Sequence, residues 1–87
     1  MNPKARGEFL KRISTSGFSI TEESDTLTLR PRGAEATAEV TIQEVEPNVW
    51  SVVRASGEYG GFSRGKKRKF FEANLTQWAT EAVLQTT

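Results

Sequence analysis

The chain has 87 residues with 12 basic and 11 acidic side chains, so its formal net charge at pH 7 is only +1. It contains no cysteine and no histidine, which excludes disulfides, thiol nucleophiles, imidazole bases and the usual zinc or copper ligands. A chain of this length, with 36% hydrophobic residues, has room for one core. We therefore expect a single domain over residues 1–87 that is not an enzyme and uses no cofactor.

Residues 3–16 carry the signals of an amphipathic helix. Pro3 suits the first turn, and Gly17 stands just past the expected end. Three apolar residues between them share one stripe: Phe9, Leu10 and Ile13.

Alternating apolar and polar residues then predict three strands. The strands cover Thr26–Arg30, with a start as early as Phe18, then 36–43, with a bulge or the strand end at Val45, and then Val49–Ala55. Because turn residues separate these segments, we expect an antiparallel meander.

The last helix should begin near Gly65 or Lys66. Its buried stripe has helical spacing and consists of Phe71, Leu75, Trp78, Ala79 and Ala82. We expect loss of Trp78 to unfold the domain. The predicted fold is α+β with the order α-β-β-β-α, a three-stranded antiparallel sheet and both helices on one face.

A basic block at residues 64–69 is the strongest functional signal, with five cations in six residues. It exceeds the net charge of the chain, so the remainder is net negative. A helix start disfavours cations, which suggests that the block binds an external anion. The candidate phosphate-binding residues are Arg64, Lys66, Lys67, Arg68 and Lys69, with Lys11 and Arg12 as secondary contacts and Tyr59 and Phe62 as candidate stacking groups.

The same residues have plainer interpretations. The block could be a solvated turn paired with Glu58 and Glu72, and the glycines before it could be a flexible connection. Glu22, Glu23 and Asp25 lack the spacing of a calcium loop, so we expect no metal site. Residues 34–49 carry four glutamates and no cation, which predicts a charge dipole if this strand faces away from the helices.

A helix, a meander and a second helix with a basic entry resemble the double-stranded RNA-binding domain family. The resemblance implies that the run from Ser63 to Lys69 grips phosphates across a major groove, while Arg6, Lys11 or Arg12 contact the RNA from the first helix. In this chain Phe70 and Phe71 follow the basic run, where the family has small residues.

The sequence thus predicts a small non-catalytic module that binds nucleic acid, DNA or RNA, with little sequence specificity. The alternative is an inhibitor or accessory subunit that docks on an acidic protein surface through the same loop, or adds a strand at a sheet edge. No segment has the roughly 20 apolar residues that span a bilayer, and we expect a cytoplasmic protein with no small-molecule substrate.

Overall fold

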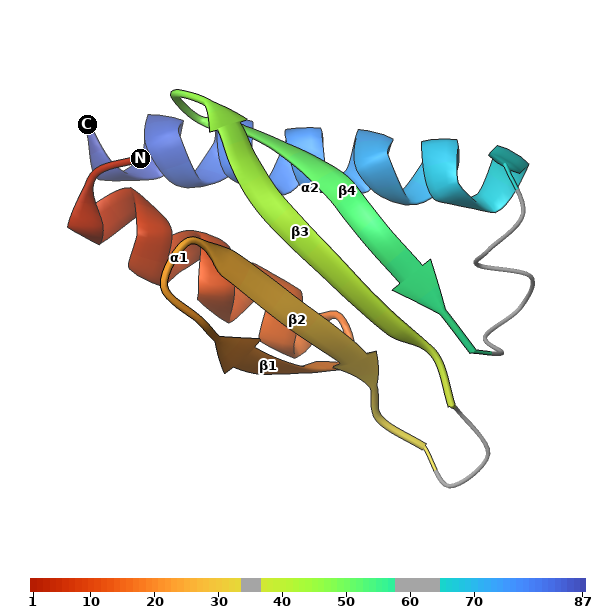
Figure 1. Ribbon diagram of the computed structural model, residues 1–87. Coiled ribbons are helices and arrows are strands. Elements are labelled where there is room, and N and C mark those ends of the chain that lie inside the picture. Colours follow the sequence, from red (N-terminus) through yellow and green to blue (C-terminus); the bar gives the residue numbers. More distant parts are fainter. Residues whose placement is uncertain (34–36, 58–64) are drawn as a thin grey trace.

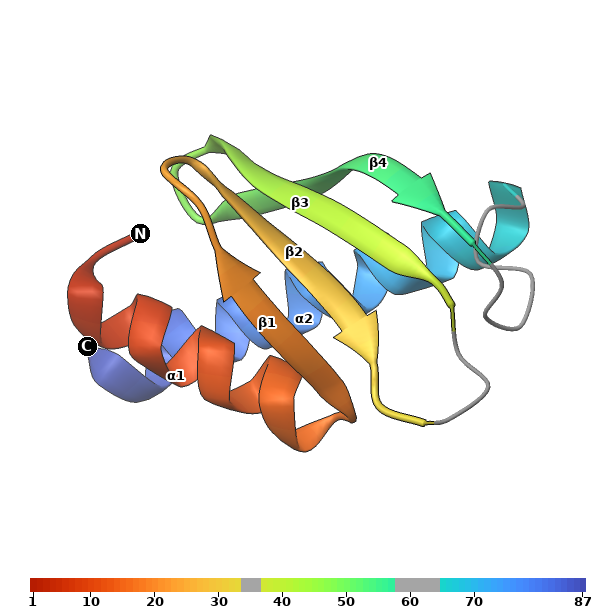
Figure 2. The same ribbon diagram turned by 60° about the horizontal axis from the view of Figure 1, so that its bottom comes forward.

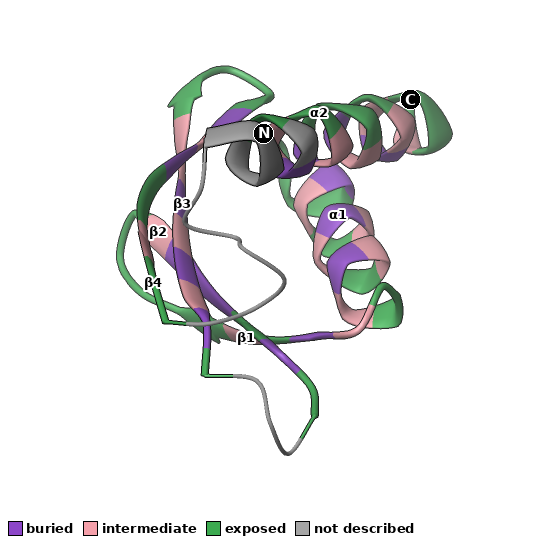
Figure 3. Cartoon of the chain, turned by 90° about the vertical axis from the view of Figure 1, so that its right-hand side faces the viewer, coloured by how far each residue is buried: buried purple, intermediate pink, exposed green. Residues whose placement is uncertain are grey.

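The computed structural model describes residues 1–33, 37–57 and 65–87, and for residues 65–68 and 70 it describes the backbone only. The elements in chain order are α1 (Pro3–Thr15), β1 (Phe18–Glu22), β2 (Thr26–Pro31), β3 (Glu39–Glu46), β4 (Val49–Ser56) and α2 (Gly65–Thr86). The strands form one antiparallel sheet in the order β1-β2-β3-β4. Both helices cover the same face of this sheet (Figures 1 and 3), so the predicted α+β class is confirmed.

The sheet has four strands, and the prediction of three was wrong. The stretch from Phe18 to Pro31 is a hairpin, in which Phe18 is opposite Pro31 and Glu22 is opposite Leu27. The backbone N–H of Glu23 donates to the carbonyl of Thr26 at 2.9 Å and closes the turn. This short turn divides the apolar alternation into two strands that pair with each other.

The ends of α1 follow from local chemistry, as predicted. Asn2 is the N-cap, and its side-chain oxygen accepts the backbone N–H of Ala5 at 2.8 Å, while Pro3 occupies the first helical position. Gly17 follows the C-cap with φ +102°, a conformation that favours glycine. The predicted start of α2 at Gly65 is also confirmed.

Two β-bulges interrupt the pairing of β3 with β4. Glu44 and Glu46 face Trp50 and Val49, which leaves Val45 as the extra residue of β3. The bulge predicted at Val45 is therefore confirmed. A second register shift leaves Val53 as the extra residue of β4. Both bulge residues expose their side chains, with Val45 at 51% and Val53 at 46%.

The core lies between the sheet and the helix layer. Its largest fully buried side chains are Phe9, Ile13, Leu27, Leu29, Val40, Ile42 and Leu75. Trp50 is 3% exposed, and its ring lies 5.0 Å from that of Phe9. The predicted stripe of α2 faces this core, except that Trp78 is only partly buried. The apolar faces of two helices and four strands thus close a single core.

The meander gives the sheet two chemically different ends. The β1–β2 and β3–β4 turns lie side by side at one end, which we call the turn end (Figures 1 and 2). At the other, the loop end, β2 and β4 finish and β3 and α2 begin (Figure 2). Because α2 starts at the loop end, its first residues lie far from both turns.

Candidate nucleic-acid interface

The basic block predicted from the sequence is at the start of α2, which begins at Gly65. Within the block, Lys69 has an exposed side chain that forms no ion pair with a described residue. The remaining members of the candidate site lie outside the described residues, namely Tyr59, Phe62 and Arg64 together with the side chains of Lys66, Lys67 and Arg68.

The backbone at the start of α2 adds to the positive potential of the block. The first turn of the helix contains no acidic residue. The first N–H groups of any helix have no partner within that helix, and the helix dipole places partial positive charge there. The positive end of the helix dipole repels the basic side chains at this position, whereas an external anion would be attracted by the dipole and by these side chains.

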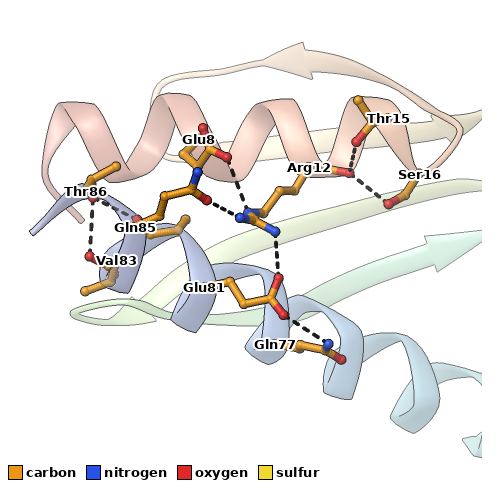
Figure 4. A network of polar contacts seen from close by, with 10 residues as sticks. Glu8, Arg12, Thr15, Ser16, Gln77, Glu81, Val83, Gln85 and Thr86 are labelled. Atoms are coloured by element: carbon orange, nitrogen blue, oxygen red, sulfur yellow. Dashed lines mark hydrogen bonds and ion pairs between the residues drawn. The ribbon is translucent and has the colours of Figure 1, made fainter.

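The structure separates the two secondary contacts predicted in α1. Lys11 is exposed and forms no ion pair with the described residues. Arg12 is bound within the fold: its Nη1 donates to Glu81 Oε2 at 2.6 Å, and its Nε lies 3.5 Å from Glu8 Oε1. Its Nη2 donates to the side-chain oxygen of Gln85 (Figure 4). Arg12 therefore joins α1 to α2, and a phosphate would have to compete with two carboxylates for it.

Carboxylates gather at the turn end. Glu22 finishes β1, Glu23 and Asp25 lie in the adjacent turn, and Glu44 and Glu46 finish β3. Arg6 pairs with Glu22 at 3.2 Å. Three of these carboxylates are exposed and form no ion pair with a described residue, namely Glu23, Asp25 and Glu46. Charge is therefore separated along the strands, rather than between the helix face and the sheet face.

Glu44 is the ionised group most tightly held at the turn end. The ammonium group of Met1 donates to its Oε2 at 2.7 Å, and the backbone N–H of Asn48 donates to the same oxygen at 2.8 Å. Burial opposes ionisation of Glu44, but these two hydrogen bonds, together with the positive charges of Met1 and Arg6, outweigh it. The pKa of Glu44 consequently lies below its ordinary value of 4.5.

Two arginines at the loop end, Arg30 and Arg32, are bound by groups within the fold. Arg30, on the outer face of β2, donates to Glu39 Oε1 at 2.6 Å and to Thr21 Oγ1 at 3.1 Å. Arg32 donates to the carbonyl and the hydroxyl of Ser14 and so ties the end of β2 to α1. Both guanidinium groups are partly exposed but already engaged.

Gly57 holds the loop end together through a close backbone approach. Its φ is +79°, and a Cβ added there would overlap the carbonyl of Thr37 and lie 2.9 Å from the Cα of Ala38. The end of β4 therefore packs against the segment that enters β3. This position requires glycine for space as well as for its φ.

Arg54 is a candidate residue that the sequence analysis missed. With Trp50 and Val52 facing the core, strict alternation would turn Arg54 inward as well. The bulge at Val53 shifts the phase, so Arg54 pairs with Thr41 on the outer face and is exposed. It forms no hydrogen bond or ion pair with a described residue. The sequence signal that could have indicated an exposed Arg54 is the run of β-forming residues around Val53, because a strand with an extra residue in such a run can contain a bulge.

No family model, curated protein or solved structure matches this chain. Within the described ranges, no three or more acidic side chains come close enough to hold a metal ion. Neither helix, over its described residues, combines the length and apolar character needed to cross a membrane.

Proposed function

We propose that this protein is a small, cytoplasmic, non-catalytic module that binds the phosphate backbone of nucleic acid with little sequence specificity. The contacts are made by Arg64, Lys66, Lys67, Arg68 and Lys69, at and before the start of α2. Lys11 is a secondary contact, whereas Arg12 contributes mainly its charge, because it is ion-paired with Glu8 and its Nη1 and Nη2 donate to Glu81 and Gln85.

The separation of charge along the strands carries this proposal. Five carboxylates lie at the turn end, and the block begins α2 at the opposite end of the sheet. A polyanion that approaches such a molecule is attracted to one end and repelled from the other. Charge-assisted contacts to phosphate oxygens supply affinity and orientation, while sequence would be read only by groups that reach base edges.

The aromatic side chains of the described core support backbone recognition over base stacking. Phe9, Phe18, Trp50 and Phe71 are buried, and Trp78 packs edge-on against Phe71 at 6.1 Å. Proteins that hold single strands usually stack bases on exposed rings. If stacking occurs here, it falls to Tyr59 and Phe62, as the sequence analysis proposed.

Replacing Lys66, Lys67, Arg68 and Lys69 together by alanine tests the proposal. Titration of a labelled 20-base-pair duplex and a 20-nucleotide single strand, at several salt concentrations, measures the affinity and its salt dependence. We expect the wild type to bind and the slope of log K against log salt to fall by about 3 to 4 in the variant, because each lost phosphate contact removes about 0.9 for a duplex.

A charge-preserving variant is the matched control. Replacing Lys66, Lys67 and Lys69 by arginine keeps every positive charge, so we expect its affinity and salt slope to stay close to the wild-type values. If the alanine variant binds as well as the wild type, or if the wild type binds neither probe, the proposal is wrong.

Exposed apolar residues along the β3–β4 hairpin favour a protein-docking module as the second candidate. Val45, Val49 and Val53 are 51%, 44% and 46% exposed, and β4 is an edge strand to which a partner could add a further strand. Under this hypothesis, replacing Val49 and Val53 by threonine abolishes capture of a specific partner and leaves nucleic-acid titrations unchanged. Capture that depends on the basic block would instead favour docking on an acidic surface.

A further inference from the structure

No described helix covers the outer face of the sheet, and one row of residues paired across the strands on this face ends in an arginine. Thr21, Thr28 and Thr41 are paired across the first three strands, and Arg54 completes the row on β4. The hydroxyls of Thr28 and Thr41 lie 3.4 Å apart. The helices lie on the other side of the sheet, and no described element covers this face (Figure 3).

Arg54 differs from the other arginines whose side chains are described. Arg6, Arg12 and Arg30 each pair with a carboxylate, and Arg32 donates twice to Ser14. Arg54 is exposed and donates to no described residue. A guanidinium in water presents five N–H donors in a fork that matches two phosphate oxygens, so this side chain is available to an external phosphate.

The charges of the described residues around Arg54 leave it net positive. The row that contains Arg54 has only hydroxyl groups besides it. The carboxylate nearest in register is Glu39, in the next row opposite Ser56, and Arg30 holds it at 2.6 Å. β4, which carries Arg54, ends at Ser56 and is the last strand before the basic block at the start of α2. With respect to the described residues, Arg54 is therefore an unpaired cation at the same end of the molecule as the proposed phosphate site.

We propose that the phosphate-binding surface extends from the start of α2 mainly onto the outer face of β4, with Arg54 as a stronger phosphate contact than Lys11, and not across the helix layer through Arg12. This inference rests on the proposed function, since it gives the direction in which the polyanion lies on the loop end. A polyanion that crossed the helix layer would contact Arg12, which is already paired with two carboxylates. A polyanion on the outer face of β4 would contact Arg54, which forms no ion pair with a described residue.

The test compares Arg54→Ala with Arg54→Lys, Lys11→Ala and Lys4→Ala against the same labelled duplex and single strand. Lys4 is an exposed cation in the first turn of α1 beside the turn end, so it serves as the matched control. We expect Arg54→Ala to weaken binding on the order of 3- to 10-fold and to lower the salt slope by about 1. Arg54→Lys should keep the slope and lose part of the affinity, because lysine keeps the charge without the fork. Lys4→Ala should match the wild type.

Each outcome separates the two proposals. If the wild type binds and the alanine variant of the block does not, but Arg54→Ala binds as the wild type does, the extension onto β4 is wrong and the proposed function stands. If Lys11→Ala weakens binding more than Arg54→Ala, the polyanion crosses the helix layer and the extension is overturned. If the wild type binds neither probe, both proposals fail. Unchanged far-ultraviolet circular dichroism and melting curves confirm that a loss of affinity is not a loss of fold, since Arg54 has no described partner to lose.

Discussion

At the scale of single residues, Glu44 is the group whose ionisation contributes most clearly to the fold. Its carboxylate accepts hydrogen bonds from Met1 and Asn48, and its pKa is lowered. The unfolded chain therefore binds a proton at this site more readily than the folded chain does. The stabilisation is present above pH 4.5 and is lost as the pH falls through the lower pKa of the folded state.

Glu44→Gln should accordingly destabilise the protein by about 1 kcal/mol at pH 7, because the ion pair with the Met1 ammonium is lost while the amide oxygen can still accept from Asn48. The difference from the wild type should shrink as the pH falls below 4.5, because the unfolded wild-type chain then takes up a proton at this site before the folded chain does. Urea denaturation of both chains, each beginning at Met1, measures this from pH 3 to 7. A difference that stayed constant over that range would exclude a contribution from the charge.

Gly17 and Gly57 illustrate two reasons why a fold requires glycine, a positive φ and a lack of space for a Cβ. Both have positive φ, but an added Cβ meets nothing within 4 Å at Gly17 and overlaps backbone at Gly57. Gly17→Ala should cost about 1 to 2 kcal/mol from backbone strain alone. Gly57→Ala should cost about 2 to 4 kcal/mol, because the end of β4 must also move away from Thr37 and Ala38. Equal losses in urea denaturation would contradict the close approach at the loop end.

At the scale of elements, the two tryptophans have unequal roles. The position of Trp78 on the stripe of α2 predicts that its loss unfolds the domain. Trp78 is only partly buried, whereas Trp50 of β4 is 3% exposed, packs on Phe9 and has the guanidinium of Arg6 5.9 Å from its ring. The inner face of the sheet, where both helices meet it, holds the more deeply buried ring.

Trp50→Ala should therefore cost about 3 to 5 kcal/mol, which approaches the whole stability of a small domain. Trp78→Ala should cost about 1 to 2 kcal/mol and leave the protein folded, because its side chain is only partly buried at the margin of the core. Thermal melts followed by circular dichroism compare the two, and Trp50→Phe provides a folded reference if Trp50→Ala does not fold. A larger loss at Trp78 than at Trp50 would overturn this ranking.

At the scale of the whole molecule, the meander topology arranges the charge. Antiparallel strands joined by short turns bring the first and third turns to one end of the sheet, so the carboxylates of residues 22–25 and 44–46 gather there although they are far apart in sequence. The molecule is 37 Å long, and salt screens exposed charges over about 8 Å at physiological ionic strength. An anion at the loop end is therefore little affected by the carboxylates at the turn end.

Local sequence signals determined the helices, the ends of α1 and the positions of the apolar alternation. Asn2, Pro3 and Gly17 fix the ends of α1 through groups a few residues apart, and the stripe of α2 follows from helical spacing. The absence of cysteine and histidine likewise limits the chemistry without any structure. Such features can be read from the sequence because the interactions that produce them lie within a few residues of one another.

Pairing across the chain decided the rest. Three features depend on a strand register or on a contact between residues distant in sequence. They are the division of residues 18–31 into two strands, the outward position of Arg54 and the ion pair of Arg12 with Glu81. A bulge of one residue at Val53 reverses the face of Arg54, and the composition of β4 is the same whichever face that side chain takes. The sequence by itself therefore located the concentration of positive charge. Only the tertiary structure decided which of the described cations outside it are paired with described carboxylates, since ion pairs form between elements that folding brings together.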